Sequence, residues 1–108
     1  MFEDLDFTPG NVVYNDFDIN DKMPLSKQIY SLKEDLFQVN YNNKYIIDVG
    51  WYPEFNKSGK FNIVIIKDCN WEKPIEKKSC NDIKTLKVYI EEFSLKVKSL
   101  INYKNQDL

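Results

Sequence analysis

The chain has 108 residues, which is enough for one small domain with a modest hydrophobic core. Hydrophobic residues make up 43% of it and charged residues 30%, a balance that excludes a disordered chain and predicts a solvated surface. The net charge is −2, and no apolar run approaches the roughly 20 residues of a membrane span, so we expect no membrane partner.

The residue types that are missing exclude several kinds of chemistry. Without histidine, Ser/His and Cys/His catalytic arrangements cannot form. Without arginine, the best bidentate contact to a base is lost, so we expect no nucleic-acid ligand. Gly10, Gly50 and Gly59 lie too far apart for a phosphate-binding loop, and Cys69 and Cys80 are too few for a structural zinc site. We therefore expect no cofactor, no metal and two reduced thiols.

Charge is divided unevenly along the chain. Residues 1–56 hold ten acidic residues and four lysines, a balance of −6, whereas residues 57–108 hold seven acidic residues and eleven lysines, a balance of +4. An acidic half of this kind favours a basic protein partner. The N-terminus lacks a basic segment followed by an apolar one, so we expect a cytoplasmic location.

In chain order, the first predicted segment is an acidic arm over residues 1–23, draped on the domain. Its Pro9-Gly10 pair indicates a turn, and the run NVVYNDF has the composition of a short edge strand. Apolar residues then recur every three or four positions, which predicts a helix over about 24–39. The residues that carry this periodicity are Leu25, Ile29, Leu32, Leu36 and Val39.

The period then falls to two, which predicts a β-hairpin over about 44–52 and 60–67. Pro53 ends its first strand because proline cannot donate a hydrogen bond to a ladder. Gly50 is expected to permit a bulge or the close approach of an aromatic neighbour, and Gly59 to supply a positive φ in the loop.

Two further elements follow the hairpin. A short strand is expected at about 75–79. The clearest helical periodicity of the chain then predicts a long helix over about 81–103, with Asn81-Asp82 as its cap.

These elements predict one α+β domain, in which an antiparallel sheet of about three to four strands carries both helices on one face. The core side chains should be the alternate apolar residues of the hairpin and the apolar stripe of the last helix. We expect the least accessible of them to include Trp51, Ile63, Ile90 and Phe93.

Asp48 and Glu54 are the candidate catalytic pair, because paired carboxylates are what glycoside hydrolysis requires. Asp48, however, falls on the outward face of an amphipathic strand, and Glu54 falls in a loop, where solvated carboxylates are ordinary. No further acid, base or phosphate cradle accompanies them. We therefore predict that the chain is not an enzyme.

Aromatic residues beside carboxylates suit a surface that recognises a basic protein. A solvated acidic loop that binds nothing would have the same composition, and the residues alone do not separate the two. The predicted partner-binding residues are Asp16, Phe17, Asp18, Asp21, Tyr52, Glu54 and Phe55.

A resemblance favours the binding interpretation. Residues 47–74 read IDVGWYPEFNKSGKFNIVIIKDCNWEKP. The succession of D-V-G-W-Y-P, G-x-F and W-x-x-P resembles small immunity proteins encoded beside bacterial polymorphic toxins, including those of contact-dependent growth inhibition systems. The stretch covers about a quarter of the chain and leaves out the arm and both predicted helices. The matching positions are Asp48, Val49, Gly50, Trp51, Tyr52, Pro53, Gly59, Phe61, Trp71 and Pro74.

The resemblance implies a single immunity-protein-like domain over residues 1–108 that binds the C-terminal toxin domain of a neighbouring cell's effector. Many such toxins are nucleases with basic sites, so the expected target is a nuclease, an RNase in preference to a DNase, blocked at its active site or substrate surface. The alternative is a non-catalytic adaptor or regulatory protein that uses the same acidic surface on another basic protein.

Overall fold

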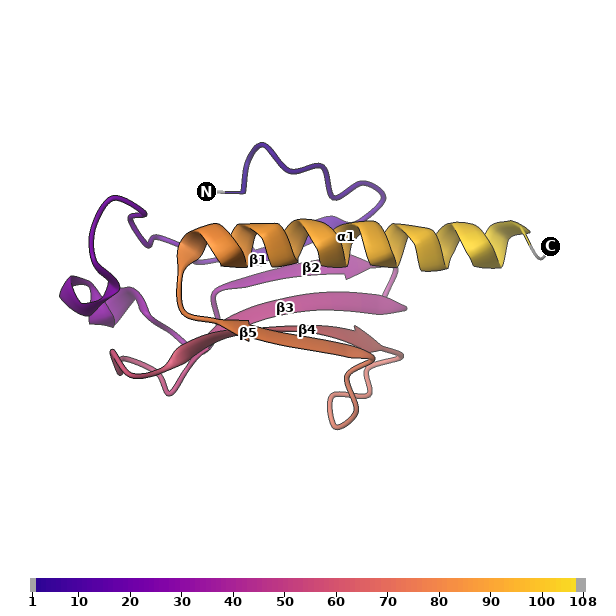
Figure 1. The fold of residues 1–108 in the computed structure, drawn as a ribbon. Helices are drawn as coiled ribbons and strands as arrows, with labels where there is room; N and C mark the ends of the chain where they lie inside the picture. Colours follow the sequence, from indigo (N-terminus) through magenta and orange to yellow (C-terminus); the bar gives the residue numbers. More distant parts are fainter. Residues whose placement is uncertain (1, 107–108) are drawn as a thin grey trace.

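A five-stranded antiparallel sheet and one long helix make up the described fold, a computed structural model that covers residues 2–106, with side chains for residues 2–102. The strands lie in the sheet in chain order, and α1 runs along one face (Figure 1). This confirms the α+β class. The elements are β1 (Asn11–Asn15), the 3₁₀ turns η1 (Leu25–Lys27) and η2 (Ile29–Ser31), β2 (Phe37–Tyr41), β3 (Tyr45–Tyr52), β4 (Lys60–Lys67), β5 (Glu76–Cys80) and α1 (Ile83–Gln106).

The core lies between α1 and the sheet. Alternate residues of neighbouring strands meet on this face, as where Ile47 pairs with Ile65. Trp51 and Phe61 pack edge to face near one end, with ring centroids 4.8 Å apart. The helix adds Leu86, Ile90, Phe93 and Val97. The predicted inaccessibility of four core side chains is confirmed, because each is at most 2% exposed: Trp51, Ile63, Ile90 and Phe93.

The predicted helix over 24–39 is wrong. Its first part forms only η1 and η2, which are separated by Gln28, whose φ of −141° is not helical. Its last part is β2, in which alternate side chains are buried. The buried residues of this strand are Phe37, Val39 and Tyr41.

Pairing with β3 is the physical reason for this difference. Just before β2, the Leu36 N–H donates to the Val49 carbonyl at 3.1 Å, and the Trp51 N–H donates to the Lys33 carbonyl at 2.8 Å. These bonds hold the chain extended beside β3. The spacing of apolar residues that predicted a helix is real, but tertiary pairing overrides it.

The sheet has five strands in the described chain, more than the three to four predicted, because both β1 and β2 join it. β1 comes from the arm and is an edge strand with a register shift between Val12 and Tyr14. The arm also contributes buried apolar side chains to the core, namely Phe2, Phe7 and Ile19.

The elements from residue 44 onward agree closely with their predictions. The hairpin strands β3 and β4 differ from the predicted bounds by a single residue, and β5 begins one residue later than expected. Asp82 caps α1, since the Thr85 N–H donates to Asp82 Oδ1 at 2.7 Å. None of the helices in the described residues combines the length and apolar character of a membrane span.

The two hairpin glycines are required because neighbouring atoms approach them closely, and not because their φ angles are positive. A Cβ on Gly50 would lie 1.9 Å from the carbonyl oxygen of Glu34 and 3.0 Å from the Tyr52 ring. The positive φ predicted for Gly59 is wrong, because no described glycine has one. A Cβ at Gly59 would lie 2.6 Å from Trp51 Nε1.

Candidate partner-binding surface

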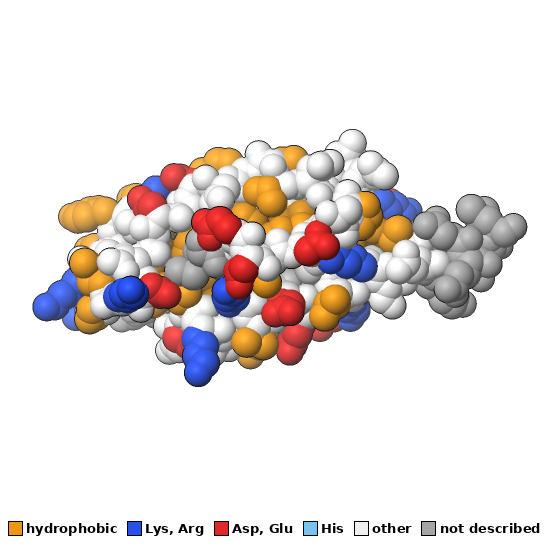
Figure 2. Space-filling view, turned by 90° about the horizontal axis from the view of Figure 1, so that it is seen from above, with side chains coloured by type: hydrophobic (Ala, Val, Ile, Leu, Met, Phe, Trp, Pro, Cys, Tyr) orange, Lys and Arg blue, Asp and Glu red, His pale blue; other side chains and the backbone are white. Residues whose placement is uncertain are grey.

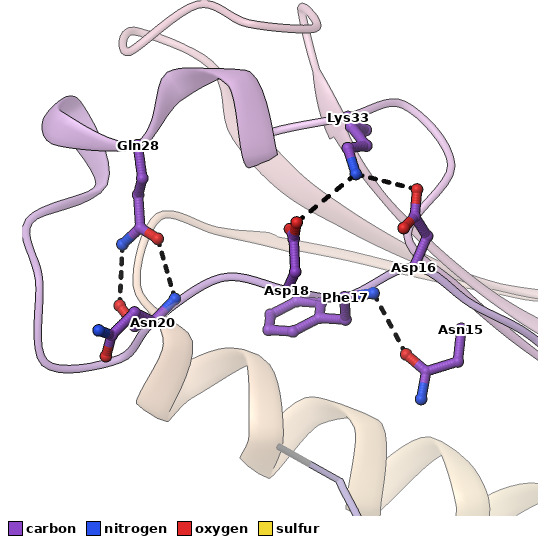
Figure 3. A network of polar contacts seen from close by, with 7 residues as sticks. All are labelled: Asn15, Asp16, Phe17, Asp18, Asn20, Gln28 and Lys33. Atoms are coloured by element: carbon purple, nitrogen blue, oxygen red, sulfur yellow. Dashed lines mark hydrogen bonds and ion pairs between the residues drawn. The ribbon is translucent and has the colours of Figure 1, made fainter.

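Two predicted partner-binding carboxylates in the arm, Asp16 and Asp18, share one lysine. Lys33 Nζ lies 2.9 Å from Asp16 Oδ2 and 3.9 Å from Asp18 Oδ2 (Figure 3). The hydrogen bond to Asp16 is the largest of the effects that raise the pKa of Lys33. Because all three side chains are partly exposed, these pairs contribute little to stability. Lys33 does compensate part of the negative charge of the arm.

Phe17 lies between these two carboxylates in the sequence and packs toward the core. Its ring centroid is 4.8 Å from that of Phe2 and 6.2 Å from that of Phe61. Since the side chain is half-buried, it anchors the arm and leaves only part of its ring for a partner.

Asp21 lies apart from the Lys33 network. It lines a cleft of about 560 Å³ in which Lys84 and Lys87 of α1 also lie. Reciprocal hydrogen bonds hold the loop that carries it: the Asn20 N–H donates to Gln28 Oε1 at 2.9 Å, and Gln28 Nε2 donates to the Asn20 carbonyl at 2.8 Å (Figure 3).

The other predicted residues, Tyr52, Glu54 and Phe55, lie at the end of the β3–β4 hairpin, hereafter the hairpin end (residues 52–55). All three are exposed. The Phe55 ring lies 5.8 Å from that of Tyr30 in η2, and both are solvent-accessible, at 43% and 78%. These two rings form an exposed aromatic pair beside the carboxylate of Glu54.

Backbone contacts of the segment 32–36 connect the arm to the hairpin end. The Leu32 carbonyl accepts from the Phe55 N–H at 2.8 Å, and the Lys33 carbonyl accepts from the Trp51 N–H. The Lys33 side chain meanwhile reaches the arm carboxylates. The structure therefore brings Asp16 and Asp18 to the hairpin end and leaves Asp21 in a separate cleft.

Sequence reasoning missed the sheet face opposite α1, hereafter the open face. One row of cross-strand partners crosses this face, and the side chains of such partners point to the same side. Two hollows share Asp48 as a lining residue: one of about 400 Å³ and one of about 360 Å³. The row consists of Tyr14, Gln38, Asp48, Val64 and Lys77.

The two hollows differ in their walls. The larger has aromatic walls from Tyr52 and from Trp71 in the β4–β5 loop, which extends on the side of the sheet away from α1 (Figure 1). The smaller has Tyr14 and Asp35 beside Asp48. Period-two alternation placed Asp48 and Tyr52 on one face of the strand, but Tyr14 could be placed beside them only once β2 was known.

Asp48 is half-buried at the centre of the open face. Gln38 Nε2 donates a hydrogen bond to its Oδ1 at 3.1 Å, and within the described residues it forms no ion pair with a lysine. Burial raises the pKa of Asp48, the hydrogen bond from Gln38 lowers it, and the charge of Asp35 raises it further. The carboxylate has thus lost hydration without gaining a compensating cation.

The negative potential of several carboxylates converges on Tyr52. Burial raises the pKa of its hydroxyl most, and the charges of Asp48, Asp35 and Glu34 raise it further. Neither Glu34 nor Asp35 forms an ion pair within the described part of the chain. The open face and the hairpin end therefore form one acidic surface with exposed aromatic rings.

Several acidic side chains near α1 are instead paired with lysines. Asp4 lies 2.8 Å from Lys87 Nζ, and Glu92 lies 2.9 Å from Lys78 Nζ. In Figure 2, which views the molecule from above the orientation of Figure 1, acidic and lysine side chains alternate over the surface. This side offers no strong field of one sign to a charged partner.

Asp48→Asn is expected to raise the melting temperature at pH 7. Because the pKa of Asp48 is raised in the folded state, its ionised carboxylate destabilises the fold at pH values above that pKa. The penalty is lost as the pH falls below the ordinary aspartate range, where folded and unfolded chains are both protonated. The gain should therefore be full at pH 7 and vanish at about pH 3. Thermal denaturation at the two pH values measures it.

Glu91→Gln is the matched control, because it removes one exposed carboxylate from α1 and should leave the melting temperature nearly unchanged. If Asp48→Asn melted below the wild type at pH 7, the carboxylate would be favourable where it lies, and the electrostatic description of the open face would be wrong.

Comparisons with protein-family models, curated proteins and solved structures give no match for this chain. Cys69 and Cys80 are free thiols, and the described residues contain no group of three or more His, Cys, Asp or Glu side chains that could hold a metal ion. The acidic surface is therefore the feature from which a function can be argued.

Proposed function

We propose that this chain is an immunity protein that binds a nuclease toxin domain in the cytoplasm and neutralises it, by covering its active site or its substrate surface. The observation that carries the proposal is the acidic, aromatic surface of the open face and hairpin end, where Glu34, Asp35 and Asp48 lack lysine partners among the described residues. The chain acts by binding, with no catalytic step of its own.

Charge complementarity supports a nuclease as the target. A nuclease that binds phosphates presents lysine and arginine side chains, and a surface of opposite sign accelerates its capture. An RNase is the preferred target, and an acidic surface of this kind would compete with RNA for the same cations. The resemblance of residues 47–74 to immunity proteins supports neutralisation of a toxin as the biological role of such binding.

The exposed aromatic rings support a protein, and not a small charged solute, as the partner of this surface. Tyr52, Phe55 and Trp71 are each between 41% and 49% exposed, and Tyr30 is more so. Tyrosine and tryptophan are enriched at protein interfaces because they combine apolar area with a polar group. Rings beside unpaired carboxylates provide both affinity and orientation.

The alternative function is a non-catalytic adaptor or regulatory protein that uses the same surface on another basic protein. Gene context separates the two proposals, since an immunity gene should lie directly downstream of a toxin reading frame. An adaptor would have no such neighbour and would not protect cells from a toxin.

Co-expression with the product of the reading frame directly upstream tests the proposal. We expect the upstream C-terminal domain alone to arrest growth, this chain to restore growth, and the two proteins to purify as a complex without nuclease activity. If the two folded proteins fail to associate, or if the complex retains full toxicity, the proposed function is wrong.

A further inference from the structure

Four residues of the pattern in residues 47–74 surround one hollow on the open face. Asp48, Tyr52, Trp71 and Pro74 all line the hollow of about 400 Å³, although they come from β3 and from the distant β4–β5 loop. Its lining also includes the apolar Val64 and Ile66. Ile66 is buried yet lies outside the core cluster between α1 and the sheet, so this face has apolar packing of its own.

The hollow combines the features that recognise a flat cation. Asp48 supplies a carboxylate whose Oδ1 accepts from Gln38, which leaves Oδ2 available to another donor. Aromatic faces attract cations, arginine above all, because the guanidinium both stacks and donates in its plane. Charge-assisted hydrogen bonds between guanidinium and carboxylate are among the strongest in proteins.

No lysine among the described residues forms an ion pair with Asp48. Lys77 lines the same hollow, but in the cross-strand row Val64 separates it from Asp48, at two strand spacings or about 10 Å. Lys33 is held by Asp16 and Asp18. The second hollow, with Tyr14 and Asp35, adds negative charge on the other side of Asp48.

We propose that the open face binds an arginine side chain of a basic partner protein, with the guanidinium at Asp48 and the rings of Tyr52 and Trp71 against it. This deepens the proposed function and rests on it for the identity of the partner. A second copy of this chain cannot be the occupant, because the sequence contains no arginine. Asp48 is then the residue that anchors the partner, and its unfavourable burial in the free protein is relieved on binding.

A titration of the isolated, isotopically labelled protein tests the assignment without any toxin. The probes are N-acetyl-arginine methylamide and its neutral analogue, N-acetyl-citrulline methylamide, followed by nuclear magnetic resonance at low salt. We expect arginine to shift the side-chain amide signal of Gln38 and the backbone signals of Asp48 and Tyr52. Citrulline should bind about tenfold more weakly or worse, because it lacks the charge.

Asp48→Asn should abolish the difference between the two probes, and Glu91→Gln, the control of equal charge, should keep it. Equal responses to arginine and citrulline in the wild type would overturn the proposal. So would an arginine response that survives Asp48→Asn, or one confined to the hairpin end and absent from Gln38.

The result is separable from the proposed function. Toxin neutralisation without an arginine response at Asp48 would overturn this assignment and leave the immunity role intact. An arginine response at Asp48 in a chain that neutralises no toxin would retain the site and redirect the search to another basic partner.

Discussion

Gly50→Ala is expected to lower the free energy of unfolding by roughly 2–6 kcal/mol, because the added methyl group meets backbone and not a movable side chain. Its Cβ would lie 1.9 Å from the Glu34 carbonyl oxygen and 2.9 Å from the carbonyl carbon. The segment around Glu34 can withdraw only by breaking the hydrogen bonds that join it to Val49 and Trp51. Overpacking costs about 1–3 kcal/mol, and the loss of the two hydrogen bonds costs about 1–3 kcal/mol more.

Urea denaturation measures this loss. Lys60→Ala is the control, since Lys60 is an exposed residue of the neighbouring strand β4 and should change stability by no more than about 0.5 kcal/mol. If Gly50→Ala proved as stable as the control, residues 33–36 would have to lie farther from β3 than the structure places them.

Some residues of the D-V-G-W-Y-P stretch are required by the fold, as Gly50 is, and others lie on the open face. Val49 and Trp51 point into the core, and Gly50 admits the neighbouring backbone. Asp48 and Tyr52 point to the open face, where they line the same hollow. One strand therefore supplies both the rigid scaffold and the side chains that we assign to binding.

The chain from residue 44 onward could be predicted well from the sequence because its signals are local. The alternation in β3 and β4 and the long apolar stripe of α1 each lie within one element, and Asp82 is a strong cap. Each of these signals agrees with the tertiary structure, so the predicted elements formed close to where they were expected.

The chain before residue 44 could not be predicted in this way because most of its structure depends on distant partners. The apolar spacing between residues 25 and 36 fits a helix, but the backbone there bonds to β3, which follows later in the chain. β1 is the exception, because the composition of NVVYNDF predicted a short edge strand there and the segment pairs with β2. Periodicity within a segment carries no information about such pairing.

The candidate site was predictable only in part for the same reason. Exposed aromatics and carboxylates at the hairpin end follow from the loop, and Asp16 and Asp18 from the acidic arm. That Lys33 compensates these two depends on the path of the chain after η2. The convergence of Trp71 and Asp48 on one hollow depends on how the β4–β5 loop folds over the open face.

The central claim is that an acidic surface on this chain captures a basic toxin. The second prediction with a large expected effect therefore concerns the rate at which the two proteins associate. The surface variant removes the three carboxylates that lack a lysine partner among the described residues: Glu34→Gln, Asp35→Asn and Asp48→Asn. The control variant removes three carboxylates from the helix side: Asp4→Asn, Glu91→Gln and Glu92→Gln.

The most direct measurement is the association rate of each variant with the toxin domain encoded upstream, by stopped flow at low and at physiological salt. We expect the surface variant to associate about tenfold more slowly than the wild type at low salt, and the control to associate at nearly the wild-type rate. The difference should shrink at physiological salt, where the screening length falls to about 8 Å. Equal rates for the surface variant and the wild type at low salt, with both proteins folded, would contradict the claim that this acidic surface captures the partner.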